Sequence, residues 1–312
     1  MGIPELSIDQ REITLSNHSG GFFYLALYGS GAPFFTKDAF QDVYRQLKSN
    51  VQQGDKVLLK GADGVTIEYD IEVGKILEAD DPDLEYVTMK PYLNYTSPLL
   101  LIEGVYSHEA AYCGMRVYHI LILRNKHTKE PIETEILPSI DTVFTRFKRH
   151  LEVWESSKTC LELQATLDRM EFPANFKIDK IVVFAYRISQ TSEDWLHPLA
   201  NIAERRVSYQ HGTYGIVTHE DPEGFLLIDD TTLVISIMPN VPVKETVAHI
   251  AQPAMIVWDA DDGKKTLCTD PTSSRVKDFL KGSYSKTEFP HDPDNFKSVS
   301  IYTKLSSPHF TR

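Results

Sequence analysis

Hydrophobic residues follow two different spacings along this chain, one typical of helices and one typical of strands. An uninterrupted apolar run at 22–28 predicts a buried strand. The apolar residues from Phe40 to Val51 then recur at helical spacing, with Thr36 placed as the N-cap and Gly54 placed to end the helix. The chain is therefore expected to begin with a strand followed by an amphipathic helix.

After this helix the pattern is that of strands. Strands are expected at 57–59, 65–73, 86–89, 99–106 and 115–123. Parallel neighbours need a connection of a dozen residues or more, usually a helix, and no helical pattern separates these runs. The pattern therefore predicts an antiparallel meander.

The middle of the chain returns to helical spacing. One apolar stripe runs from Ile140 to Trp154, and a second from Cys160 to Met170, where Phe172-Pro173 ends it. Such stripes are typical of helices that face a core, which is favoured here over a ligand-binding face.

The last part of the chain resembles the first in the order of its expected elements. Strands are expected at 181–188, 215–218, 225–228, 233–238, 255–258, 266–268 and 299–302, with helices at 191–207 and 274–281. The separation of Pro98 from Pro253 equals that of Cys113 from Cys268. An ancient duplication is one hypothesis; the alternative is that antiparallel α+β folds share this order by chance.

These patterns predict an α+β protein in which curled antiparallel sheets pack on helices. Hot-dog-like and helix-grip-like folds are the simplest architectures of this kind, and two similar lobes would fill the chain. We expect an N-terminal lobe at 1–137, a helical connector at 138–173 and a C-terminal lobe at 174–312.

Composition narrows the function classes. Of 312 residues 42% are hydrophobic, enough for a packed core, and 32 basic against 44 acidic residues give a net charge of −12. Bulk attraction to nucleic acid is therefore excluded, and the apolar runs are shorter than the ~18 residues of a membrane span. Three cysteines without paired spacing indicate no disulfide framework, so the cytoplasm is the expected location.

Several strong motifs are missing from the sequence. It contains no phosphate-binding P-loop, no Gly-x-Gly-x-x-Gly after a strand, no Gly-x-Ser-x-Gly and no His-Glu-x-x-His. We therefore expect neither a cofactor nor a catalytic metal.

The densest polar cluster is His108, Glu109 and Tyr112, at an expected strand-turn-strand. An imidazole beside a carboxylate and a phenol can transfer protons near neutral pH, and Cys113 with His108 or His119 could form a nucleophile pair. Neighbours on a strand point to opposite faces, so only a turn could make His108 and Glu109 cooperate. A polar hairpin tip is the simpler interpretation.

Two further clusters carry carboxylates. Asp194 and His197 stand at an expected helix start, where His197 could be a general base, although helix capping is the more common role. The segment 259–263 has the sequence Asp-Ala-Asp-Asp-Gly, with Asp270 beyond it. Its register does not fit a calcium loop, which favours an ordinary Asp-Gly turn.

Two functions remain open. The first is a cofactor-independent enzyme or binder that holds a small, partly hydrophobic or acyl-type molecule in a sheet–helix cavity. Its acid–base groups would be His108, Glu109, Tyr112, Asp194 and His197. Lyase, isomerase, cyclase and thioesterase reactions would fit such a site. The alternative is a non-catalytic assembly or interaction protein, for instance a viral or scaffold component. In either case we expect a homo-oligomer without nucleic-acid or membrane partners.

Overall fold

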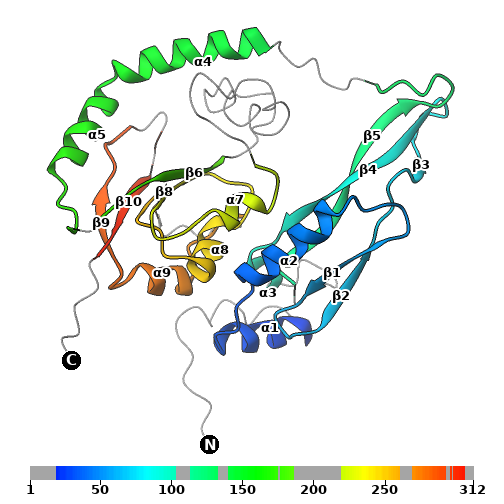
Figure 1. The fold of residues 1–312 in the computed structure, drawn as a ribbon, viewed down its shortest axis with the longest axis horizontal. Helices are drawn as coiled ribbons and strands as arrows, with labels where there is room; N and C mark the ends of the chain where they lie inside the picture. The colour runs from blue at the N-terminus through cyan, green and yellow to red at the C-terminus, as the bar shows by residue number, and fades with distance from the viewer. Residues whose placement is uncertain are drawn as a thin grey trace, which may run out of the picture. The chain divides into compact units, whose positions relative to one another are not determined.

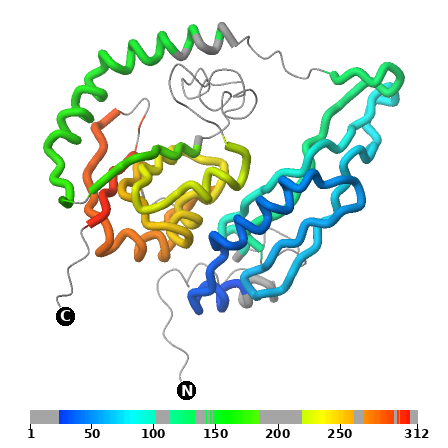
Figure 2. Tube along the Cα trace, viewed as in Figure 1, coloured from blue at the N-terminus to red at the C-terminus, as the bar shows by residue number. Residues whose placement is uncertain are grey.

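The computed structural model shows an α+β protein, with helices and three sheets among the residues it describes, which confirms the predicted class (Figures 1 and 2). The chain forms two compact units, Met1–Ile122 and Leu123–Arg312. The predicted three-part division, with its connector at 138–173, stays a prediction. The structure describes residues 19–102, 113–132, 140–174, 176–185, 219–260, 269–292, 296 and 298–305.

In its described residues the first unit has two small sheets and three helices. β1 and β2 form an antiparallel hairpin, β3 pairs antiparallel with β4, and β5 lies on the other side of β4. Helix α2 packs on β1, and α1 on α3. The elements are α1 (Ser19–Gly29), α2 (Lys37–Lys48), β1 (Lys56–Lys60), β2 (Thr66–Asp70), β3 (Ile76–Glu78), β4 (Leu84–Tyr95), α3 (Pro98–Ile102) and β5 (Met115–Asn125), the last of which continues past the boundary between the units.

The second unit is built on one five-stranded sheet in the order β6-β7-β8-β10-β9. Helices α4 and α5 precede this sheet in the chain, and α8 packs on α9. The elements are α4 (Ile140–Glu155), α5 (Lys158–Arg169), β6 (Lys180–Ala185), α7 (Glu223–Leu226), β7 (Thr232–Ile237), α8 (Val243–Ile250), β8 (Met255–Asp259), α9 (Ser274–Leu280), β9 (Tyr284–Glu288) and β10 (Val299–Lys304).

The antiparallel sheet predicted for the C-terminal lobe is wrong at three strands. β6, β7 and β8 run parallel, and only β10 and β9 are antiparallel to their neighbours. The physical reason is α8, which spans the connection from β7 to β8 and returns the chain to the same end of the sheet. The hot-dog-like or helix-grip-like lobe is therefore not the architecture of this unit.

Three predicted strands are helices. The run 22–28 lies in α1, 99–102 lies in α3, and 225–226 lies in α7. A short run that is apolar throughout has no period by which a helix can be distinguished from a strand. The proposed duplication loses its support, because the elements led by Pro98 and Pro253 are a helix and a strand.

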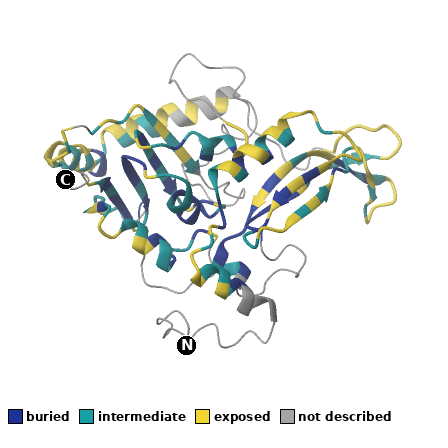
Figure 3. Ribbon diagram, turned by 60° about the horizontal axis from the view of Figure 1, so that its bottom comes forward, coloured by how far each residue is buried: buried dark blue, intermediate teal, exposed yellow. Residues whose placement is uncertain are grey.

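Burial along β7 alternates with the side-chain period of two. Figure 3 shows buried residues, in dark blue, on several strands. On one face Val234, Ile256 and Trp258 are fully or almost fully buried, and Phe184 of β6 stacks on Phe225 of α7 with ring centroids 4.5 Å apart. Part of the core of this unit therefore lies on the face that α7 covers.

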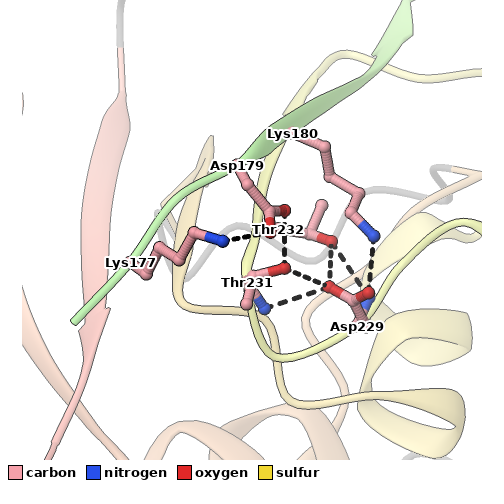
Figure 4. A network of polar contacts seen from close by, with 6 residues as sticks. All are labelled: Lys177, Asp179, Lys180, Asp229, Thr231 and Thr232. Carbon is pink, nitrogen blue, oxygen red and sulfur yellow. Dashed lines mark hydrogen bonds and ion pairs between the residues drawn. The ribbon is translucent and has the colours of Figure 1, made fainter. Parts of the chain in front are cut away.

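A polar network joins the starts of β6 and β7 (Figure 4). Asp229 Oδ1 accepts hydrogen bonds from the Thr231 backbone N–H (3.0 Å) and from the hydroxyls of Thr231 and Thr232 (2.8 and 3.0 Å). Lys180 Nζ donates a hydrogen bond to Asp229 Oδ2 at 2.5 Å. This hydrogen bond is the largest cause of an Asp229 pKa far below its usual value, and the hydrogen bonds from Thr231 and Thr232 lower the pKa further. Thr231 also donates to Asp179 at 2.7 Å. The network fixes the register in which Lys180 pairs with Thr232.

Candidate functional site

The five residues predicted to carry acid–base chemistry, His108, Glu109, Tyr112, Asp194 and His197, lie outside the described residues. Their proposed roles stay predictions. The helix expected at 191–207 and the strands expected at 215–218 and 266–268 also lie outside the described residues.

Cys113 and His119 do not form the nucleophile pair that the sequence suggested. Met115, two positions after Cys113, and His119 are four positions apart in β5, and this separation alone spans about 13 Å. His119 Nε2 instead accepts the Glu72 backbone N–H at 3.1 Å. Burial raises the pKa of the Cys113 thiol to about 11, so it stays protonated and a poor nucleophile at neutral pH.

The carboxyl ends of the parallel strands β7 and β8 carry the most unusual charged cluster among the described residues. Asp259 is the last residue of β8, and its Oδ2 accepts the Met238 backbone N–H, directly after β7, at 2.7 Å. Burial raises the pKa of Asp259. Ligands of open α/β sheets bind outside the carboxyl ends of the strands, so this edge is the place to look for a site.

Lys244 and Asp270 form a buried pair beside Asp259. The Lys244 backbone N–H donates to Asp270 Oδ1 at 2.8 Å, and Nζ donates to the Asp270 carbonyl oxygen at 3.2 Å. Nζ lies 3.9 Å from Oδ2, so the two charges interact without a direct hydrogen bond. Burial raises the pKa of Asp270 to about 7, and Asp259 and Glu245 add to the increase while Lys244 opposes it. Asp270 can therefore gain or lose a proton near neutral pH.

Glu245 is the third carboxyl of the cluster and is buried, as Asp270 is. Its Oε2 accepts the Ser273 hydroxyl at 2.5 Å, and Ser273 Oγ in turn caps α9 by accepting the Val276 backbone N–H at 3.2 Å. Burial raises the pKa of Glu245, although the hydrogen bond from Ser273 and the charge of Arg275 oppose this. The first turn of α8 is thereby tied to the first turn of α9.

His249 lies one turn after Glu245 on α8 and also belongs to the cluster. Its Nε2 lies 3.0 Å from Arg275 Nη1, and burial, assisted by the Arg275 charge, lowers the pKa of His249 to about 4. The imidazole is neutral at pH 7, so its 3.7 Å approach to Glu245 Oε1 is not an ion pair. A neutral His249 orients Arg275 rather than transferring protons.

We call Lys244, Glu245, His249, Asp259, Asp270, Ser273 and Arg275 the strand-end cluster. It contains a carboxyl whose pKa is raised to about 7, beside a lysine, and a group with a pKa near 7 is suited to general acid–base catalysis. Among the described residues no group of three or more His, Cys, Asp or Glu side chains is arranged to hold a metal ion.

The sequence had pointed to part of this cluster. Asp259 and Asp270 stood out as spaced carboxylates, but the interpretation was a turn. Lys244 and Glu245 carried no signal, because they are distant from Asp270 in sequence and only α8 brings them to it.

In the described part of the chain no helix combines the length and apolar composition that crossing a bilayer demands. Comparison with protein families, with curated proteins and with solved structures found nothing that matches this chain.

Proposed function

We propose that the second unit binds a small molecule at the carboxyl ends of β7 and β8 and carries out acid–base chemistry on it, with Asp270 as the proton-transferring group. The observation that carries this proposal is the burial of Asp270, which raises its pKa to about 7 even though the nearby Lys244 opposes the increase. A general acid or base is most effective when its pKa lies near the working pH.

Four further members of the cluster have supporting roles in this proposal. Lys244 stabilises negative charge that develops on the substrate when Asp270 takes a proton. Asp259 holds the loop after β7 through the Met238 backbone N–H. Glu245 and Ser273 fix the start of α8 against α9. The reaction class that this set supports is proton transfer at carbon or oxygen, as in an isomerase or lyase that needs no redox cofactor.

The test is a thermal-shift screen of the whole chain against 2-oxo acids, hydroxy acids and amino acids, followed by proton-exchange assays on each compound that binds. Wild type is compared with Asp270→Asn and with Asp278→Asn, a control at an exposed carboxylate on α9. A ligand at about 100 times its Kd stabilises the folded protein by about 2.7 kcal/mol. We expect a shift for wild type and Asp278→Asn that Asp270→Asn loses. An equal shift in all three proteins would exclude the strand-end cluster as the site.

A non-catalytic interaction protein is the second candidate, and one observation favours it. Tyr118 and Ile120 of β5 are 42% and 40% exposed, and the Tyr118 ring lies 6.2 Å from that of Tyr92 on β4. Apolar side chains gathered on one sheet are a common feature of protein contact surfaces.

A further inference from the structure

A groove runs between α5 and the edge strand β9 in the second unit. It consists of two adjoining hollows of about 320 and 360 Å³, which share Thr166 and Arg169 of α5 as lining residues. On the strand side Ser285 and Thr287 line one hollow, and Glu288 lines the other. The groove therefore has a helix as one wall and an exposed strand as the other.

β9 is the last strand of its sheet. It pairs with β10 on one side, and no further strand pairs with its other side among the described residues. In an antiparallel pair only every second residue of an edge strand directs its N–H and C=O to the neighbour. The remaining backbone groups of β9 are thus available to hydrogen-bond an added strand.

The charges along the groove are unequal. Three glutamates line it, Glu162, Glu171 and Glu288, against one lysine or arginine, Arg169. Lys158 lies 3.3 Å from Glu162 Oε1 and offsets that carboxylate in part. Glu171 and Glu288 are exposed, and they leave the groove with a negative rim.

We propose that the α5–β9 groove is a docking site for an extended, basic peptide segment of a partner protein, which adds to β9 as a further strand. Main-chain hydrogen bonds to β9 would supply affinity, and alternate side chains of the peptide would point into the groove. Lysine or arginine at those alternate positions would meet Glu171 and Glu288, which sets the charge preference of the site. This site is separate from the strand-end cluster and does not depend on the function proposed there.

Fluorescence anisotropy with labelled peptides tests the proposal on the full chain. The probe is acetyl-Lys-Val-Lys-Val-Lys-Val-amide, which has a strand-forming sequence with three positive charges. A peptide with Glu in place of each Lys tests the charge preference. A peptide with Pro in place of each Val keeps the charges but removes backbone N–H donors, and so tests strand addition.

We expect the Lys-Val peptide to bind and both altered peptides to bind at least about tenfold more weakly. The double variant Glu171→Lys/Glu288→Lys should weaken binding of the Lys-Val peptide by roughly tenfold. Glu130→Lys, an exposed glutamate that does not line the groove, is the matched control and should leave the affinity unchanged.

Three results would overturn the proposal. Equal affinity for the Lys-Val and Lys-Pro peptides would show that no strand is added. Equal affinity of the double variant and the Glu130→Lys control would show that the glutamates of the groove do not select the peptide. Failure of the Lys-Val peptide to bind at millimolar concentration would show that this edge takes no basic strand.

Discussion

Replacing Asp270 by asparagine should change how the stability of this protein depends on pH. The Asp270 pKa is raised from 3.8 to about 7 in the folded protein, mainly by burial. A carboxyl whose pKa is higher when folded binds its proton more tightly in the folded state. Its stabilising contribution is fully present below about pH 4 and is lost as the pH rises through 7.

The size of this effect follows from the difference between the Asp270 pKa values in the unfolded and folded states. One pKa unit corresponds to about 1.4 kcal/mol, so a rise from 3.8 to about 7 corresponds to at most about 4 kcal/mol of unfolding free energy. Asparagine keeps an oxygen that can accept the Lys244 backbone N–H. The backbone carbonyl that accepts from Lys244 Nζ is also unchanged. The substitution should therefore remove the titration with little effect on the local hydrogen bonds.

Urea unfolding followed by circular dichroism, from about pH 4 to about pH 8, measures the prediction. The stability of Asp270→Asn relative to wild type should rise over this range by about 2–4 kcal/mol and level off above pH 7. Asp278→Asn changes an exposed residue of α9, so the stability of this variant should depend on pH in the same way as that of wild type. If the Asp270→Asn and wild-type curves were parallel, the buried carboxyl would not titrate near neutral pH and the proposed proton transfer would lose its basis.

Two further predictions concern the first unit. An alanine Cβ at Gly114 would lie 2.8 Å from Cε1 of the buried Phe35, so Gly114→Ala should lower the unfolding free energy measured with denaturant by about 1–3 kcal/mol. The control is Gly29→Ala, whose Cβ would meet nothing within 4 Å and which should not destabilise the protein. Equal losses of stability in the two variants would contradict the packing argument. If the exposed residues of β5 form a self-contact, Tyr118→Ser/Ile120→Ser should abolish concentration-dependent association in sedimentation velocity. A wild-type sedimentation coefficient that does not change with concentration would rule this contact out.

Helix α2 shows what the sequence could predict well. Thr36 accepts the Ala39 backbone N–H at 3.1 Å as the expected N-cap, and Phe40 and Val43 are fully buried, as their helical spacing indicated. A local cap and a clear period act within one turn, so no distant contact was needed to place this element.

The parallel strands show why the rest could not be predicted. On the face of β7 that α7 covers, the buried residues are Thr232, Val234 and Ser236. This alternating pattern is compatible with a parallel sheet as well as with an antiparallel sheet. Only the recognition of α8 would have decided the direction of the strands. This helix was hard to recognise because its first turn follows Pro242 and has no side-chain cap. The strand-end cluster depends on that topology, because it brings together Glu245 and Ser273, which are 28 positions apart.

The network around Asp229 has a consequence for the order in which the second unit assembles. It links Lys180 to a partner 49 positions away and Asp179 to one 52 positions away, so closing this contact restricts a long stretch of chain. β9 and β10 are successive strands and enclose a much shorter loop. Because the entropy lost on closure grows with loop length, we expect β9 to pair with β10 before β6 pairs with β7 during folding. In this order of events, the contacts of Asp229 with Lys180 and Thr231 stabilise the pairing of β6 with β7 after the other strands have paired.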